Sequence, residues 1–157
     1  MVTCPLGFKI VSGGQTGADQ AALDWAIHNG IAHGGWCPKG RRSEAGEIPT
    51  CYSLTETPDS DYLQRTEWNV RDSDATLVFT LSEQSTGGSK KTVQFAQRLG
   101  SPCLHVARST DLQTVSDFLS THRIHVLNVA GSRESKEPSI RARVFEVLDV
   151  VLKPRSA

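Results

Sequence analysis

The sequence predicts an α/β protein with a single doubly wound, mostly parallel sheet between two layers of helices, a three-layer sandwich. Short β-type runs alternate with helix-type runs along the whole chain. Parallel strands need crossover connections, and helices in those connections cover both faces of the sheet. The length of 157 residues also suits one globular domain. We therefore expect residues 1–157 to form one ligand-binding domain.

The first third of the chain predicts a strand, a tight turn and a helix. The β-type run at residues 8–12 stops at two glycines, and apolar residues then recur at helical spacing over residues 18–28. A second strand is expected over residues 31–36. The irregular segment that follows, from residue 37 to about residue 59, is long for a compact domain, and such loops usually serve a site.

The rest of the chain continues the alternation. Residues 75–81 form a nearly continuous apolar run, which is typical of a strand buried on both faces. Helices are predicted over residues 61–71, 89–99, 112–122 and 138–152, and strands over residues 75–81, 102–107 and 124–129.

The charge balance argues against some classes of partner. Lys+Arg and Asp+Glu both number 17, so the chain lacks the basic excess of a nonspecific nucleic-acid or membrane-surface binder. No run approaches the ~18 apolar residues of a membrane span, and no leader pattern opens the sequence. We expect a cytoplasmic protein with four free cysteines and no metal site; a zinc site at Cys37, Cys51, His28 and His33 is disfavoured by its spacing.

Three glycine-containing turns follow predicted strands, where an open α/β sheet binds its ligands. Glycine lets a backbone approach a ligand closely, and a helix N-terminus offers unpaired N–H groups to an anion. A single Gly-Gly pair is often only a tight connection, but three such turns on one sheet edge favour an anion site. The candidate residues in these turns and the helix starts beside them are Gly13, Gly14, Gln15, Thr16, Gly17, Asp19, Thr86, Gly87, Gly88, Ser89, Thr92, Asn128, Gly131 and Arg133.

Other residues could complete the site. Lys39 in the long loop and Arg133 after the last strand are the cations we expect at the ligand. Trp36 could stack on a base or pterin ring, or belong to the core or its rim. Arg65 and Asn69, four residues apart on one helix face, could be a solvent face. None of the turns is a Walker A loop or a strict G-x-G-x-x-G fingerprint, so ATPase and NAD interpretations lose support.

These segments make the chain similar to the molybdenum carrier family. That family is a branch of Rossmann-like proteins related to the lysine decarboxylase-like nucleotide-binding group. The resemblance implies storage or delivery of the molybdenum cofactor (molybdopterin) or another phosphorylated, nucleotide-like ligand, by a homo-oligomer. It rests on IVSGGQTGAD (10–19), GGWCPKGRR (34–42), TEWNVRDSD (66–74), TGGS (86–89) and LNVAG (127–131).

The resemblance also argues against one kind of catalysis. Related phosphoribohydrolases carry a helix glutamate after their glycine-rich turn, and Gln94 falls at about that position. An amide cannot act as the general base. We therefore expect a noncatalytic carrier with no catalytic residue. The alternatives are an N-glycoside hydrolase that uses Glu67 or Asp19 as its carboxylate, and a nucleotide-sensing module.

Overall fold

The computed structural model describes residues 1–155, in which five main strands alternate with five helices as predicted. The main strands are β2 (Lys9–Val11), β3 (Ala32–Gly34), β8 (Ala75–Phe79), β9 (Cys103–Val106) and β10 (Val126–Gly131). The helices are α1 (Ala18–His28), α2 (Tyr62–Arg71), α3 (Gly87–Leu99), α4 (Leu112–Thr121) and α5 (Ile140–Val151).

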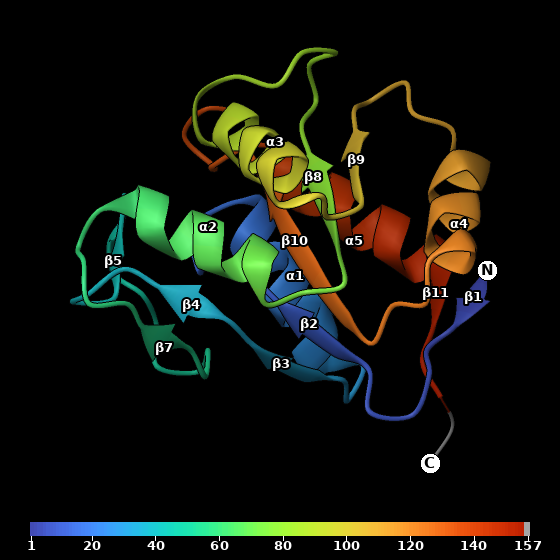
Figure 1. The fold of residues 1–157 in the computed structure, drawn as a ribbon, viewed down its shortest axis with the longest axis horizontal. Coiled ribbons are helices and arrows are strands. Elements are labelled where there is room, and N and C mark those ends of the chain that lie inside the picture. Colours follow the sequence, from blue (N-terminus) through green and yellow to red (C-terminus); the bar gives the residue numbers. More distant parts are fainter. Residues whose placement is uncertain (156–157) are drawn as a thin grey trace.

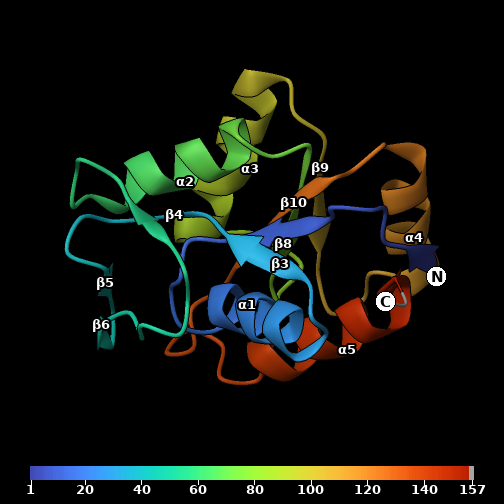
Figure 2. The same cartoon turned by 90° about the horizontal axis from the view of Figure 1, so that it is seen from below.

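The five main strands form one parallel sheet in the order β3-β2-β10-β8-β9. Figures 1 and 2 show α2 and α3 on one face of this sheet and α1 and α5 on the other. The predicted doubly wound, Rossmann-like α/β sandwich is therefore confirmed.

The last strand of the sheet lies at its centre. If the strands are counted from β10 and continued through β2, β3, β8 and β9, their order becomes 3-2-1-4-5, which is common in doubly wound sheets. The first and last strands of the chain lie side by side. β1 (Val2–Thr3) pairs in parallel with β11 (Leu152–Lys153), and the Cys4 N–H donates to the Lys153 carbonyl at 2.9 Å.

The long loop carries short strands that the sequence did not predict. β4 (Trp36–Cys37) pairs with β7 (Thr55–Glu56), and β5 (Arg42–Ser43) pairs with β6 (Gly46–Glu47). The predicted strand over residues 31–36 is therefore wrong in its second half. Gly35 interrupts it at φ 125°, a conformation that favours glycine. Leu23, Cys37, Ile48 and Tyr52 form a small apolar cluster that fixes this loop against α1.

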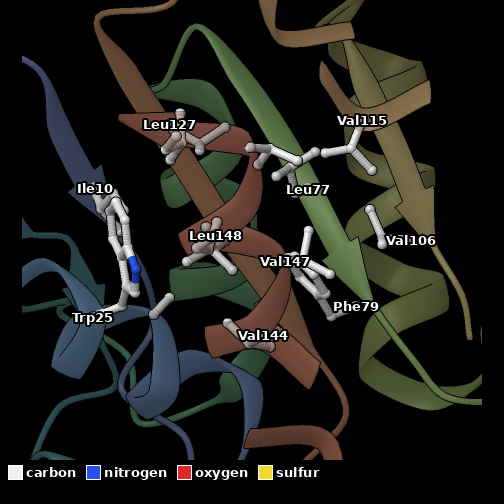
Figure 3. Packing of buried hydrophobic residues seen from close by; sticks show 14 of the residues in the cluster. Ile10, Trp25, Leu77, Phe79, Val106, Val115, Leu127, Val144, Val147 and Leu148 are labelled. Atoms are coloured by element: carbon white, nitrogen blue, oxygen red, sulfur yellow. The ribbon is translucent and has the colours of Figure 1, made fainter. Parts of the chain in front are cut away.

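The two faces of the sheet differ in character. Figure 3 shows apolar side chains of the sheet, among them Leu77 and Leu127, packed against Val147 and Leu148 of α5. Successive residues of a strand point to opposite faces. Thr76 and Asn128 are register partners that face α2 and α3, and the Asn128 side chain donates to the Thr76 hydroxyl at 3.2 Å. The polar face is where the candidate site lies.

Two predicted element boundaries were wrong near the turns. Helix α3 begins at Gly87, so Gly87 and Gly88 belong to its first turn. Strand β10 runs on to Gly131, which was predicted in a turn. Gly131 pairs with Phe79, and a Cβ at this glycine would overlap the Phe79 carbonyl. Glycine is therefore needed there for sheet packing.

Candidate functional site

A pocket lies at the carboxyl ends of β8 and β10. The chain leaves β8 for α3 on one face of the sheet and leaves β10 for α5 on the other, so the strand order switches between them. Such switch points are where open α/β sheets bind ligands. The pocket has room of about 70 Å³, enough for about five water molecules. It is lined by Gly13, Gln15, Asp19, Arg65, Thr66, Asn69, Thr86, Gly88, Ser89, Thr92, Asn128, Ala130, Gly131, Ser132, Arg133 and Lys136.

The three predicted turns do meet at this pocket. The predicted residues that line it are Gly13, Gln15, Asp19, Thr86, Gly88, Ser89, Thr92, Asn128, Gly131 and Arg133. The predicted residues that do not line it are Gly14, Thr16, Gly17, Gly87, Trp36 and Lys39.

The glycines of the first turn serve packing within the protein. A Cβ at Gly13 would overlap the Arg65 guanidinium. A Cβ at Gly14 would come within 2.9 Å of Ile48, and one at Gly17 would come within 2.5 Å of the Ser132 carbonyl. We expected these glycines to let a ligand approach the backbone. Protein atoms occupy the space beside them instead.

The N-terminus of α1 is also engaged by the protein itself. The N–H groups of Ala18 and Gln20 donate to the carbonyls of Ser132 and Gln15, each at 3.1 Å. Asp19 places a carboxyl in the first turn, where a negative charge is stabilised by the helix dipole. A second anion at this helix end would meet that carboxyl.

The N-terminus of α3 is open. Among residues 1–155, no acceptor binds the backbone N–H groups of Gly87, Gly88 and Ser89. Its N-cap, Thr86, makes no capping bond, and its first turn holds no acidic residue. A Cβ added at Gly88 would meet no atom within 4 Å. These unpaired donors, beside the Lys136 ammonium that donates to the Thr86 hydroxyl, form an anion-binding arrangement.

A buried ion pair forms the wall of the pocket beside α1. The Arg65 Nη1 lies 3.0 Å from the Asp19 Oδ2, and both side chains are nearly buried. Burial raises the pKa of the Asp19 carboxyl, and the Arg65 guanidinium opposes that rise. Since the Gln15 N–H also donates to Asp19 at 3.1 Å, this carboxyl is held firmly in place.

Gln15 has a buried donor without a partner. Its side-chain Oε1 accepts from the backbone N–H groups of Thr16 at 3.1 Å and Glu44 at 3.0 Å, which fixes which end of the amide is oxygen. Its Nε2 is buried and has no hydrogen-bond partner among the described residues. Gln15 is 5% exposed and lines the pocket. An unsatisfied buried donor is costly, and a bound acceptor would remove that cost.

Two glutamates hold the loops around the pocket. Glu44 accepts from the Thr16 hydroxyl and, at 2.5 Å, from the Ser135 hydroxyl, and these bonds lower the pKa of its carboxyl. Partial burial raises the pKa of the Glu137 carboxyl. Hydrogen bonds from Ser132 and from the backbone N–H groups of Leu81 and Ser82 lower it by more, so the pKa is lowered overall. Neither carboxylate lines the pocket.

Several predicted residues lie elsewhere. The Trp36 indole N–H donates to Asp72 at 2.8 Å, and its ring packs edge-on against Trp68. Lys39 is exposed, and its backbone N–H donates to the Asp59 carbonyl at 3.1 Å. Trp36 was considered for stacking on a ring and Lys39 as a cation at the ligand, but neither side chain lines the pocket.

Of the two carboxylates considered for hydrolase chemistry, Asp19 lines the pocket and Glu67 does not. Glu67 forms an ion pair with Arg98 at 2.5 Å. Gln94 lines a different hollow, between α2 and α3. On α3 the residues that face the pocket are Gly88, Ser89 and Thr92.

Six lining residues were not predicted. Arg65 and Asn69 were noted as a polar helix face, and their spacing of four was the available signal that both project to one side. Lys136 lies in the segment after β10, near the predicted Arg133. Ala130 and Ser132 lie within the third predicted turn, beside Gly131, although they were not chosen as site residues, and Thr66 follows Arg65 on α2. The six are Arg65, Thr66, Asn69, Ala130, Ser132 and Lys136.

Residues 1–155 show no group of three or more His, Cys, Asp or Glu side chains placed to hold a metal ion. No helix in this part of the chain has the length and apolar character needed to cross a membrane.

Comparisons with known proteins agree with this architecture. A model of the circularly permutated YpsA SLOG family matches residues 10–152. A crystal structure from Syntrophus aciditrophicus SB, named "Putative molybdenum carrier protein", is similar with 45% sequence identity and a TM-score of 0.88, over 92% of this chain and 94% of that one. Comparison with curated proteins finds no match. The permutation in the family's name fits a sheet whose order becomes 3-2-1-4-5 when counted from β10.

Proposed function

The chain belongs to the circularly permutated YpsA SLOG family, and on that premise we propose that it is a carrier for a phosphorylated small molecule, the molybdenum cofactor. The name of the similar Syntrophus protein supports the choice of cargo. The observation that carries the proposal is the open N-terminus of α3. Three backbone donors there lack acceptors among residues 1–155, and two of them, Gly88 and Ser89, line a pocket that also holds Arg133 and Lys136.

The pocket fits the phosphate end of such a ligand. Backbone N–H groups at a helix start, hydroxyls such as Ser89 and a nearby ammonium are the donors that phosphates prefer. The space of about 70 Å³ is far smaller than the ~300 Å³ or more of a pocket that encloses a whole ligand. The phosphate would therefore be enclosed, and the pterin ring would extend toward the surface.

The pocket offers no comparable set of ligands for a molybdenum ion. None of the residues that line it is a cysteine or a histidine, and Asp19 is their one carboxylate. Asp19 is already paired with Arg65. The protein would hold its cargo by the phosphate, and the metal would stay with the cofactor.

Retention of the cofactor tests the proposal. Purified protein would be incubated anaerobically with molybdenum cofactor and passed through a desalting column, and bound molybdenum would be measured. We expect saturable retention by the wild type. Lys136→Ala should weaken it by about tenfold, because an ammonium beside the phosphate is lost. Lys153→Ala, which removes an exposed lysine of β11 that does not line the pocket, should retain the wild-type affinity.

Absence of saturable retention by the wild type would refute the carrier proposal. Equal retention by Lys136→Ala would show that the cofactor binds at another place.

One observation favours a second candidate, an N-glycoside hydrolase. Asp19 is a buried carboxylate in the pocket, and its pKa is raised, as that of a general acid often is. Incubation with nucleoside monophosphates should then release free base, and Asp19→Asn should abolish the release. Detection of such turnover would replace the carrier function with an enzymatic one.

We also propose that the carrier is a homo-oligomer. Leu63 of α2 and Leu99 of α3 are 45% and 43% exposed, and a hollow between these helices is lined by Leu63 and Phe95. Sedimentation velocity would test this, and a monomer at micromolar concentration would contradict it.

A further inference from the structure

Three arginines surround the ring of Tyr62, the first residue of α2. The guanidinium carbons of Arg42, Arg65 and Arg133 lie 4.5, 5.3 and 5.5 Å from the ring centroid. They come from β5, from α2 and from the segment after β10. The electron-rich face of an aromatic ring attracts cations, so Tyr62 holds together three like charges that would otherwise repel one another.

Only one of these charges is closely balanced. Arg65 pairs with Asp19 at 3.0 Å. The nearest carboxylate oxygen to Arg133 is 4.0 Å away, on Glu44, beyond hydrogen-bond distance. Glu44 already accepts from Thr16 and Ser135. Among residues 1–155, no acceptor binds the Arg133 guanidinium.

Arg42 also lacks a close carboxylate partner among residues 1–155. Its guanidinium donates to the Ser60 carbonyl at 3.1 Å and forms no ion pair with the described residues. Asp59 and Asp61 line a surface hollow together with Arg42, but they accept from backbone N–H groups at the start of α2. Arg42 and Arg133 therefore offer planar sets of donors of the kind that bind phosphate in pairs.

This cluster lies next to the end of the pocket where Lys136 stands. The Lys136 N–H donates to the Arg133 carbonyl at 3.1 Å, so one tight turn carries both cations, and both line the pocket. Because Arg42 and Arg133 contact the same ring, their guanidinium carbons are at most about 10 Å apart. A ligand that leaves the α3 end of the pocket past Arg133 would therefore meet the Arg42 guanidinium within about 10 Å.

We propose that Arg42 and Arg133, positioned by Tyr62, form a second phosphate subsite beside the one at α3. The ligand class is then a diphosphate compound, such as a nucleoside diphosphate or a dinucleotide form of a pterin, in preference to a monophosphate. This inference rests on the proposed function, since the first phosphate is the one placed at α3. Tyr62 is a positioning residue, which acts through the two arginines.

Calorimetric titration with two simple probes tests the subsite. Inorganic phosphate and pyrophosphate would be titrated into the full chain at constant ionic strength, and the ratio of the two dissociation constants would be measured. We expect pyrophosphate to bind the wild type at least about tenfold more tightly. Arg42→Ala and Tyr62→Ala should bring the ratio close to one. Tyr62→Phe, which keeps the ring, should restore it, and Arg123→Ala, an exposed arginine at the opposite end of β10, should leave it unchanged.

The outcomes separate the two proposals. Phosphate binding with a wild-type ratio near one, or a ratio unaffected by both Arg42→Ala and Tyr62→Ala, would overturn the second subsite and leave the α3 site standing. Failure of both probes to bind the wild type would overturn the subsite and the proposed function together. Because Arg42 is exposed, its variant reports on binding even if Tyr62→Ala fails to fold.

Discussion

The N-termini of α1 and α3 both come after a parallel strand and both have glycines at the helix start, yet they differ in what surrounds them. At α1 the space beside Gly13 is filled by Arg65, and Asp19 supplies the negative charge. At α3 the first-turn N–H groups have no acceptor among residues 1–155, and Gly88 faces open space. The same local pattern can therefore close a helix end or leave it open to a ligand. The deciding residues come from elsewhere in the sequence.

The largest effect is expected from opening the α1 end. Arg65→Met would leave the buried Asp19 carboxylate unpaired, so the free energy of unfolding at pH 7 should fall by about 3–5 kcal/mol. Arg98→Met, which removes the exposed partner of Glu67, is the matched control and should cost no more than about 1 kcal/mol. Urea denaturation measures both.

The pH dependence of the same variant sharpens the prediction. The pKa of Asp19 is raised by burial, and loss of Arg65 would raise it further. The loss of stability should therefore be greatest at neutral pH and shrink as the pH falls and Asp19 becomes neutral. If Arg65→Met cost no more than Arg98→Met, the idea that this pair closes the α1 end would be wrong.

A smaller loss is expected from Gly17→Ala. Gly17 has φ 81°, and a Cβ there would lie 2.5 Å from the Ser132 carbonyl. The free energy of unfolding should therefore fall by at least about 2 kcal/mol. Gly30→Ala separates the cost of the backbone conformation from the cost of the close contact, because Gly30 has φ 65° but a Cβ there would meet no atom within 4 Å. It should cost only about 1–2 kcal/mol. Equal losses in the two variants would show that packing at Gly17 is not tight.

Gly88→Ala should have the opposite profile. The added methyl group meets no protein atom, so stability should change by less than about 1 kcal/mol. It would, however, stand where a bound phosphate approaches the α3 backbone, and phosphate affinity should drop by about tenfold. Thermal melts and calorimetry measure the two effects. Unchanged affinity would argue against a close approach at this glycine.

The smallest effect is expected from Glu44→Gln. The pKa of Glu44 is lowered by bonds from Ser135 and Thr16, so its contribution to stability is present above its ordinary pKa and is lost as the pH falls through the lowered value. The stability difference between wild type and Glu44→Gln should therefore be seen at pH 7 and vanish in acid. A difference independent of pH would mean that the carboxylate charge does not hold these loops.

The fold could be predicted from periodicity because each element carries its own signal. The predicted helix over residues 18–28 matches α1, and the apolar run from Ala75 contains β8. The errors arose where one residue changes the chain direction, as at Gly35, or where tertiary pairing extends a strand, as at Gly131. Those features depend on contacts with distant parts of the chain.

The candidate site was only partly predictable for the same reason. Thr86, Gly88 and Ser89 line the pocket because they open the helix that follows β8, a position that can be read from the sequence. Arg65 lines it because Gly13, 52 positions earlier, leaves space for its guanidinium. No local pattern distinguishes such an arginine from one that faces solvent.

Amide chemical shifts give the most direct test of the open α3 site. Inorganic phosphate would be titrated into uniformly ¹⁵N-labelled protein. We predict saturable shifts of the Gly87, Gly88 and Ser89 amides and none for Ala18 and Gln20 at the start of α1. Shifts centred on α1, or no saturable change at Gly87–Ser89, would contradict the account.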